Sequence, residues 1–328
     1  MRTKILGAAV ALVAFFFGSV YSATEKVLID FTEFEKNMTQ VLDKDKQVHK
    51  EEIAKHPELD FAQYGYPTVE FTIDDWKLEM WKIKLNSSAN TVKNNLDSYC
   101  QKVESKRFGT VMGVRVHFPE WKFLSWALVS PPYEFFAYYD NGSYVNQLTA
   151  DGENEMPMGV LVNVGQIKYI QAWVYGLNYT HQIALRLKDR DGNIQEYFLG
   201  HTQFDGWRQL TWVNPVYADD IRDRILQRIP LYPLSYPYVK FDSYVVYKPE
   251  TDAGGDFIIY FKDVKLAFDR AIVRESLDIE DEKWWGILAQ KTLDQKLYEL
   301  KTIGEQLHLM KQEQMRMSNE TVPGGGAN

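Results

Sequence analysis

The 328-residue sequence contains a single cysteine, Cys100, so no disulfide can form within one chain. No cysteine stands directly after the apolar N-terminal segment, which argues against a lipid anchor. Stability must therefore come from core burial, with assembly as a second source. We expect the thiol of Cys100 to be buried in that core, as cysteine commonly is.

Motifs of catalysis and metal binding are also lacking. The sequence has neither a Gly-X-Ser-X-Gly nucleophile elbow nor a His-Glu-X-X-His zinc motif, and its six histidines are dispersed. Adjacent acidic residues such as Asp74–Asp75 and Asp219–Asp220 fit solvated faces better than the two cleft carboxylates of a glycosidase. The sequence therefore predicts no enzyme, no metal site and no cofactor, and a glycoside hydrolase is the lowest-ranked alternative.

Positive charge is scarce as well. Lys and Arg number 37 against 45 Asp and Glu, a net charge of −8, whereas nucleic-acid binding needs clustered cations. Arg2 and Lys4 begin an export signal, which continues with the apolar run 5–20 and small residues for cleavage after Ser22 or Ala23. Removing residues 1–22 brings the net charge to −10 (−8 − 2). We expect an exported protein, secreted or periplasmic, with no nucleic-acid partner and no membrane span, since the apolar run is too short.

What the sequence has in plenty is apolar and aromatic residues, at 45% and 14%. Segments of alternating or continuous apolar residues, bounded by turn residues, each predict a strand. These segments are residues 25–34, 68–73, 76–85, 109–118, 125–129, 135–139, 167–175, 182–187, 194–199, 208–213, 239–247 and 257–268. The charged residues 36–56 predict a helix or a loop that ends at Pro57. The pattern predicts an all-β fold, a β-sandwich of roughly a dozen strands over residues 23–272.

One loop, residues 189–193, resembles the start of a calcium-binding loop, because Asp189 and Asp191 supply oxygen ligands at its first and third positions. The twelfth position, where such a loop needs a glutamate, is Gly200. Alternating strands flank the segment. We therefore interpret it as an Asp-Gly hairpin turn and not as a calcium site.

Aromatic side chains supply the candidate contact surface. Trp173 and Tyr175 share one face of their strand, and Ala172 and Val174 share the other. One face must fill the core, so the two rings either pack there or stack on a sugar or a protein partner. Three tyrosines of a proline-rich segment, residues 231–238, are further contact candidates: Tyr232, Tyr236 and Tyr238.

After residue 272 the period of the apolar residues changes from strand to helix. Spacings of three and four predict an amphipathic α-helix over residues 273–318, followed by a flexible tail, residues 319–328. The apolar stripe consists of Leu293, Leu297, Leu300, Ile303, Leu307 and Met310, and Trp284 and Trp285 lie near the start of the helix as further contact candidates. The stripe is too short for a long coiled coil, so we expect it to dock on its own sandwich or on a neighbouring subunit.

Several motifs in this order, together with the export signal, resemble the FlaA family, the outer-layer (sheath) proteins of spirochaete periplasmic flagellar filaments. The motifs are residues 85–89 (LNSSA), 113–119 (GVRVHFP), 131–135 (PPYEF), 172–179 (AWVYGLNY), 187–193 (LKDRDGN), 199–200 (LG) and 204–210 (FDGWRQL). The last motif also resembles the galactose-binding-like jelly rolls of many carbohydrate-binding modules. The resemblance implies a jelly-roll β-sandwich ahead of the C-terminal α-helix.

The resemblance also implies a structural role. Proteins of this family coat a core of FlaB-type flagellins in the periplasm and affect filament stiffness, shape and motility, and the family offers no catalytic residues. The implied partners are flagellin core subunits, with other sheath proteins and glycans on flagellin left open. The alternative is a secreted carbohydrate-binding module or lectin, and in a hybrid of the two the sandwich binds glycans attached to flagellin.

Overall fold

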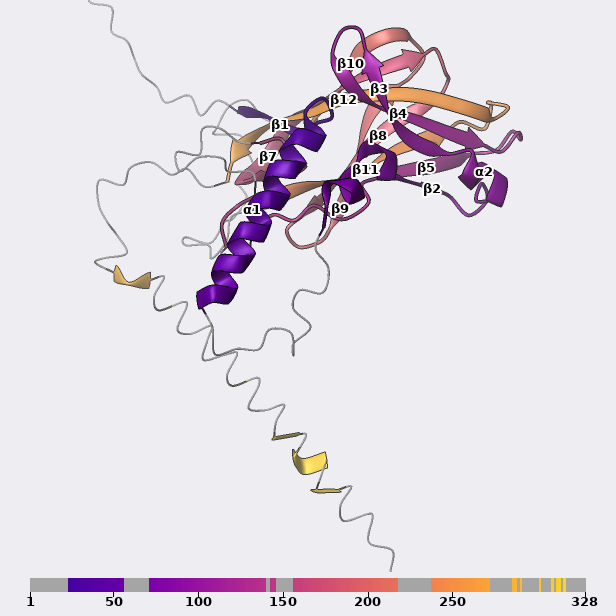
Figure 1. Cartoon of the computed structure of the whole chain (residues 1–328). Coiled ribbons are helices and arrows are strands. Elements are labelled where there is room, and N and C mark those ends of the chain that lie inside the picture. The colour runs from indigo at the N-terminus through magenta and orange to yellow at the C-terminus, as the bar shows by residue number, and fades with distance from the viewer. Residues whose placement is uncertain are drawn as a thin grey trace, which may run out of the picture. The chain divides into compact units, whose positions relative to one another are not determined.

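The computed structural model describes residues 23–55, 71–139, 142–145, 156–217 and 237–271, and in the C-terminal segment residues 285–287, 290, 301, 308–309, 311–313 and 315–316. The chain divides into two compact units, residues 1–227 with 236–272, and residues 228–235 with 273–328. All strands of the described chain belong to the first unit, which is a jelly-roll β-sandwich (Figure 1).

Two six-stranded sheets with antiparallel pairing form the sandwich (Figure 1). Sheet A has the order β10-β7-β12-β4-β3, and β1 also pairs with β12. Its strands are β1 (Thr24–Asp30), β3 (Tyr99–Ser105), β4 (Gly109–Phe118), β7 (Val164–Leu177), β10 (Asp205–Val213) and β12 (Gly255–Arg270). Sheet B has the order β2-β5-β11-β8-β9, and β6 also pairs with β11. Its strands are β2 (Lys82–Leu85), β5 (Ser125–Ser130), β6 (Val160–Val162), β8 (Gln182–Asp189), β9 (Ile194–His201) and β11 (Tyr238–Lys248).

The strand register defines two opposite ends of the sandwich. Gly255, the first residue of β12, lies opposite Phe118 at the end of β4, and Arg270 lies opposite Val164 at the start of β7. We call the end with the loops 119–124 and 249–254 the proximal end. The other end, with the turns that follow β8 and β10, is the distal end.

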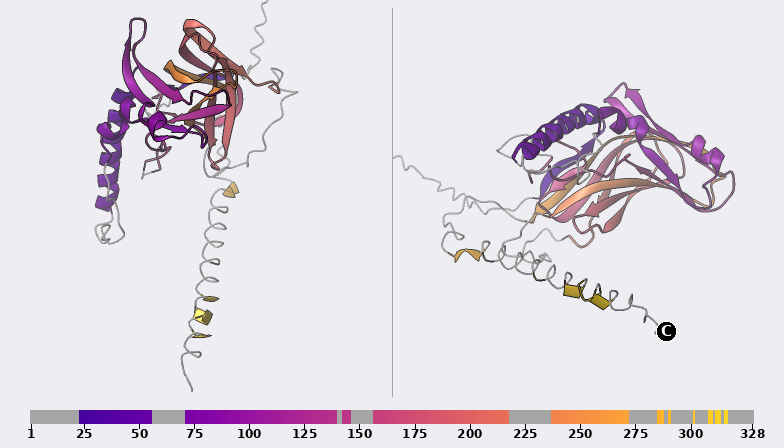
Figure 2. Two further views of the ribbon diagram at one scale, coloured as in Figure 1. Left: turned by 90° about the vertical axis from the view of Figure 1, so that its right-hand side faces the viewer. Right: turned by 60° about the horizontal axis from the view of Figure 1, so that its bottom comes forward.

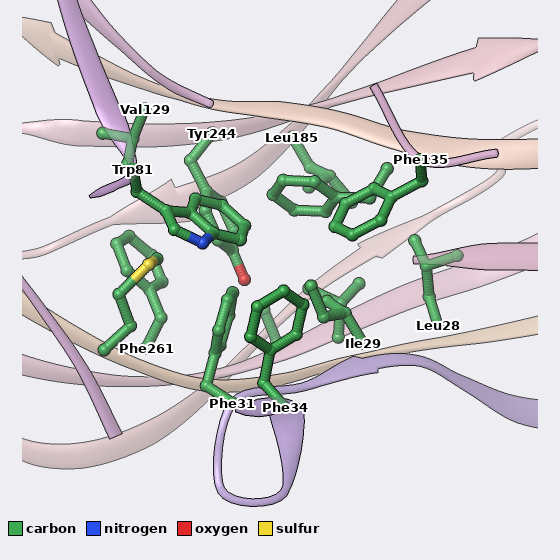
Figure 3. Packing of buried hydrophobic residues seen from close by; sticks show 14 of the residues in the cluster. Leu28, Ile29, Phe31, Phe34, Trp81, Val129, Phe135, Leu185, Tyr244 and Phe261 are labelled. Atoms are coloured by element: carbon green, nitrogen blue, oxygen red, sulfur yellow. The ribbon is translucent and has the colours of Figure 1, made fainter. Parts of the chain in front are cut away.

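The core between the sheets is rich in aromatic rings (Figure 3). Tyr244 of sheet B stacks on Phe261 of sheet A, with ring centroids 3.9 Å apart and planes 15° apart. Phe31, which follows β1, packs edge-on against Trp81 at 5.3 Å. Burying side chains of this size contributes about 1.5–3 kcal/mol each, so these contacts between sheets are a main source of stability in a chain without disulfides.

Helix α1 (Phe34–Lys55) lies alongside the sandwich (Figure 2), and it confirms the helical interpretation of residues 36–56. Its buried apolar side chains follow one another at spacings of four, three, one and six: Phe34, Met38, Val41, Leu42 and Val48. The ring of Phe34 contacts Trp81 at 5.9 Å and Phe135 at 6.2 Å. The short helix α2 (Val92–Leu96) begins at Thr91, whose Oγ1 accepts a hydrogen bond from the backbone N–H of Asn94 at 3.2 Å.

Most of the predicted strands are confirmed, and four segments need correction. The predicted strand 25–34 ends at Asp30, because residues 31–33 form a turn and α1 begins at Phe34. Residues 76–85 are a strand only over β2, because two 3-10 turns precede it, η2 (Ile73–Trp76) and η3 (Leu78–Met80). Asp75 fixes the first turn by accepting hydrogen bonds from the backbone N and Oγ1 of Thr72 at 2.9 and 2.8 Å. The predicted strand 68–73 is wrong over residues 71–73, which lead into the same turn. Residues 68–70 lie outside the described chain.

Residues 135–139 were predicted as a strand and are not one. Their only pairing among the described residues is an isolated bridge between Tyr138 and Tyr144. Alternate side chains, Phe135, Ala137 and Tyr139, are nevertheless buried. The apolar alternation thus reported burial correctly, but burial against α1 and the core does not require a neighbouring strand. Strands β3 and β6 were not predicted.

In the second unit, the described residues from 285 to 316 are helical except Gly286. The backbone N–H of Gln290 donates to the carbonyl of Gly286 at 2.9 Å. The predicted leucine stripe of this helix lies outside the described residues.

Candidate interaction surfaces

The outer face of sheet A carries a cluster of aromatic side chains, here called the ring cluster: Phe108, Trp173, Tyr175, Trp207 and Tyr260. Tyr175 lies opposite both Trp207 of β10 and Tyr260 of β12 in the sheet register. The centroid of its ring is 5.4 Å from that of Trp207 and 5.7 Å from that of Tyr260, both edge to face. The rings face outward because the alternate residues of β7, Ala172 and Val174, are buried in the core.

The tip of the β3–β4 hairpin covers part of this cluster. The ring of Phe108 lies 5.8 Å from Trp173 and 5.0 Å from Trp207. The guanidinium of the exposed Arg107 lies 5.3 Å from the ring of Trp173, and the ammonium of Lys262 lies 5.4 Å from that of Phe108. Contacts of this kind contribute about 0.5–1 kcal/mol each at exposed sites. The result is a half-buried aromatic surface with a cationic rim.

A glycine makes room for one ring of the cluster. Gly113 of β4 lies opposite Tyr260. A Cβ atom on Gly113 would lie 2.8 Å from Cγ2 of Val103 and 3.3 Å from the ring of Tyr260. Any larger residue at position 113 would therefore displace Tyr260 or the neighbouring strand β3.

Of the predicted contact residues that the structure describes, Trp173 and Tyr175 lie on the same face of β7 in the ring cluster. Tyr238 lies at the start of β11 in sheet B, where its ring is 5.7 Å from that of Tyr138 and beneath the ammonium of Lys240. Trp285 is exposed in the second unit. The other predicted contact residues lie outside the described residues: Tyr232, Tyr236, Trp284, Leu293, Leu297, Leu300 and Leu307.

A buried polar group at the proximal end was missed by the sequence analysis. Lys248 is fully buried. Its Nζ donates hydrogen bonds to the backbone carbonyls of Trp121 and Asp252, each at 2.9 Å. Burial lowers the pKa of this ammonium group, and the nearby carboxylate of Asp252 opposes that shift. Sequence alone could not reveal this lysine, because the alternation of β11 merely places position 248 inward.

His181 is buried beside this lysine. Its ring stacks on that of Phe257, with centroids 4.3 Å and planes 23° apart, and its Nδ1 is 3.8 Å from a carboxylate oxygen of Asp252. Neither ring nitrogen has a hydrogen-bond partner among the described residues. Burial lowers the pKa of His181 to about 4, against the opposing effect of Asp252, so the ring is neutral at physiological pH.

Two predictions about single residues are confirmed. Cys100 is buried, and burial raises the pKa of its thiol to about 12. Residues 189–193 form the hairpin turn between β8 and β9, in which Asp189 accepts hydrogen bonds from the backbone N–H and the Nδ2 of Asn193 at 2.8 and 3.0 Å.

The described residues contain no group of three or more His, Cys, Asp and Glu side chains placed to hold a metal ion. Within the same residues, no helix is long and apolar enough to cross a membrane.

The two sheets and the ring cluster define a β-sandwich protein with aromatic side chains on the outer face of one sheet. Residues 24–276 match the family model of the flagellar filament outer layer protein FlaA, and the chain belongs to this family. The flagellar filament outer layer protein of Spirochaeta aurantia is 38% identical over 73% of both chains. That of Treponema pallidum (strain Nichols) is 33% identical over 100% of this chain and 98% of its own. The family resemblance seen in the sequence is thereby confirmed.

Two solved carbohydrate-binding modules show a weak likeness to this chain. The module TmCBM61, solved with β-1,4-galactotriose, has a TM-score of 0.27 and 10% identity, over 60% of this chain and 92% of its own. A family 11 module from a Clostridium thermocellum cellulase has a TM-score of 0.28 and 10% identity, over 60% and 91%.

Proposed function

We propose that the protein is a structural component of the outer layer of a periplasmic flagellar filament. The observation that carries this proposal is the alignment of the whole chain with an outer layer protein of Treponema pallidum at 33% identity. In this role the protein coats a core of flagellin subunits, contributes to the stiffness and shape of the filament and to motility, and catalyses no reaction.

A coat of this kind binds through repetition. Each subunit makes a few modest contacts with the core and with its neighbours, and repetition along the filament multiplies their effect. Such contacts need surfaces that hold one shape before binding, since side chains and loops that become ordered on binding weaken it. The ring cluster, whose side chains already contact one another, is a surface of this type.

The experiment compares filaments purified from cells with and without the gene for this chain, imaged by electron cryomicroscopy. We expect the filament without the protein to lack outer density and to bend more easily. A filament of unchanged diameter and stiffness, with the protein absent from the purified wild-type filament, would refute the proposal.

Export and the C-terminal helix are further parts of this proposal. We propose that residues 1–22 are a signal peptide removed on export, and that residues 273–318 form an amphipathic helix that contributes contacts through Leu293, Leu297, Leu300 and Leu307. Mass spectrometry of the protein from purified filaments tests the first point, with an N-terminus at Ala23 or Thr24 as the expected result. Truncation before Leu277 tests the second, because unchanged binding to filaments would remove the helix from the interface.

A second candidate function is the recognition of glycans, including glycans on flagellin. The ring cluster favours it, because half-exposed tryptophan and tyrosine rings can stack on sugar rings and Arg107 adds a hydrogen-bond donor at the rim. The test is calorimetric titration of the purified protein with glycans released from flagellin. Trp173→Ala is expected to abolish binding, whereas Trp126→Ala, a half-buried tryptophan on the outer face of sheet B, should leave it unchanged. Failure of the wild-type protein to bind would remove this candidate without affecting the coat proposal.

A further inference from the structure

The edge strands of the two sheets differ in how well they are protected. In sheet A the strands at the ends of the order are β10 and β3, and in sheet B they are β9 and β2. An edge strand offers unpaired backbone N–H and C=O groups to any further strand. Proteins usually protect such edges by short length, lysine, proline, a bulge or a covering segment. An edge that has none of these protections is therefore a candidate interaction surface.

Most edges of this sandwich are protected. Strand β2 is four residues long and carries two exposed lysines. On β3, the Nζ of Lys102 pairs with Glu35 of α1 at 2.8 Å. The outer edge of β1 is bonded to the segment ahead of β6, since the backbone N–H of Gly159 donates to the carbonyl of Leu28 at 2.7 Å. Strand β9 has a bulge opposite Ile183 and Ala184, which interrupts its edge.

Within the described residues, β10 has none of these protections. It runs for nine residues without lysine or proline, and its charged side chains are Asp205 and Arg208. Its pairing with β7 continues through all nine residues without a bulge. It is rich in the aromatic and β-branched residues that favour strands: Trp207, Thr211, Trp212 and Val213. A strand of this composition at an edge is suited to pairing with a further strand.

Hydrogen bonds at both ends of the β10–β7 ladder show which backbone groups face the open edge. The N–H of Asn178 donates to the carbonyl of Phe204 at 2.8 Å, and the N–H of Asn214 donates to that of Lys168 at 2.9 Å. Bonded and non-bonded pairs alternate along an antiparallel ladder, so the even-numbered residues of β10 bond to β7. The odd-numbered residues turn their N–H and C=O away from the sheet, where the described chain supplies no further strand: Asp205, Trp207, Gln209, Thr211 and Val213.

The β10 edge of a second copy fits this edge. Two β10 strands related by a two-fold axis run antiparallel, and their longest overlap places Gln209 opposite Gln209. Trp207 then lies opposite Thr211, and Asp205 opposite Val213, so that residues with open backbone groups face one another over the whole strand. Neither charged side chain of β10 faces a like charge in this register. A contact of this type needs only one self-complementary surface.

We infer that β10 of one molecule pairs antiparallel with β10 of a second copy of this chain, so that their two A sheets become one continuous sheet. The backbone hydrogen bonds supply the affinity in pairing of this kind. Because the two-fold axis is perpendicular to the sheet, the ring clusters of both copies lie on the same face. As a contact between neighbouring subunits of an outer layer the pair rests on the proposed function, whereas pairing in solution does not.

Disulfide trapping of the full chain tests the register. The Cα atoms of a hydrogen-bonded antiparallel pair lie about 5.5 Å apart, a separation that a disulfide can span. Gln209→Cys should therefore form a covalent dimer on mild oxidation. The matched control is Val213→Cys at a 62% exposed position, which lies opposite Asp205 and more than about 25 Å from its own copy at 3.4 Å per residue. It should stay monomeric. Equal trapping of both variants, or none of Gln209→Cys, would overturn the inference.

Sedimentation velocity of the purified full chain, over a range of concentrations, measures the pairing without a cross-link. We expect the wild type to form dimers. Thr211→Pro should remain monomeric, because its N–H faces the open edge and a proline there blocks the pair without removing a bond to β7. The matched control is Ile194→Pro at the exposed start of β9, which should dimerise like the wild type. Dimerisation of Thr211→Pro at the wild-type level, or a wild type that is monomeric at its highest soluble concentration, would contradict the pairing.

Thermal melts show whether each variant is folded. If Thr211→Pro melts well below the wild type, Gln209→Lys takes its place, since it sets like charges opposite each other at the centre of the pair and should weaken dimerisation severalfold; an unchanged dimer would overturn the inference.

Binding to purified flagellin cores separates the two proposals. A wild type that dimerises but does not bind the cores would refute the coat function and support the pairing. A wild type that binds the cores while remaining monomeric would refute the pairing alone. If Thr211→Pro also abolished the binding of such a monomer, the edge of β10 would be assigned to a flagellin segment instead of a second copy.

Discussion

Replacing His181 by phenylalanine is expected to remove a pH-dependent loss of stability. The ring of His181 lies flat on Phe257 in the core, and neither of its nitrogens is hydrogen-bonded within the described chain. A phenyl ring fits the same stack and has no polar atoms that must leave water. Above about pH 7 the variant should therefore be as stable as the wild type to within about 1.5 kcal/mol.

The magnitude follows from the two pKa values. A histidine in an unfolded chain has a pKa of about 6.5, and that of folded His181 is about 4 because of burial. Between these values the unfolded chain binds a proton that the folded chain does not. The free energy of unfolding of the wild type is therefore fully retained above pH 6.5 and falls by about 1.4 kcal/mol per pH unit as the pH is lowered, or about 3 kcal/mol across the window.

Urea unfolding followed by tryptophan fluorescence, at several values between about pH 7.5 and about pH 4.5, measures this loss. The difference between wild type and His181→Phe should grow in favour of the variant as the pH falls, since all other titrating groups are common to both. His201→Phe, at an exposed position, should give a curve parallel to the wild type. A constant difference between wild type and His181→Phe across the range would show that His181 titrates in the folded protein as it does in the unfolded chain.

Three further substitutions or treatments test the packing. Gly254→Ala should lower the free energy of unfolding by more than about 3 kcal/mol, because its Cβ would lie 1.9 Å from the carbonyl oxygen of Pro119 and its φ is +86°. The control Gly192→Ala has a φ of +85° and no atom within 4 Å, and it should lower the free energy of unfolding by about 1–2 kcal/mol. Equal losses for the two variants in urea unfolding would contradict the contact. Tyr244→Ala should lower the free energy of unfolding by about 3–5 kcal/mol. Tyr244→Phe should lower it by less than about 1 kcal/mol, because the hydroxyl has no hydrogen-bond partner in the described chain. A large loss for the phenylalanine variant in the same assay would reveal a partner. Cys100 should not react with a thiol reagent in the native protein, since burial raises its pKa to about 12, and should react fully in denaturant; one equivalent of rapid native reaction would contradict its burial.

The sequence predicted those features that depend on neighbours along the chain. The alternation in residues 109–118 and the Asp-Gly signal at residues 189–193 correspond to β4 and to the β8–β9 turn. The alternation of residues 167–175 placed Trp173 and Tyr175 on one face of their strand, but it left open whether that face was the core or the outside. The strand predicted for residues 76–85 was wrong ahead of β2, because 3-10 turns that bury Trp76 and Leu78 also produce a two-residue apolar period.

The ring cluster and the site of Lys248 depend on contacts between segments that are distant in sequence, and no local sequence pattern predicts such contacts. The partners of Tyr175 in the ring cluster come from β10 and β12, and Phe108 arrives from the tip of another hairpin. In the sequence, nothing distinguishes Lys248 from other polar residues that follow an apolar segment. Only the closing of the loop 119–124 over it reveals an ammonium that holds the backbone beneath Trp121.

The pairing of the middle strand of each sheet, β12 in sheet A and β11 in sheet B, bears on why such a sandwich suits a filament's outer layer. One edge of β12 pairs with β7, and its other edge pairs first with β4 over residues 255–261 and then with β1 over residues 263–268. In sheet B, β11 is arranged in the same way, with β8 on one edge and β6 followed by β5 on the other. Each central strand thus runs through the whole sandwich and joins shorter strands of its proximal and distal halves. Bending the molecule across the strand axis would strain the ladders on both edges at once. A subunit of the filament's outer layer that is built in this way would therefore resist bending across its strand axis.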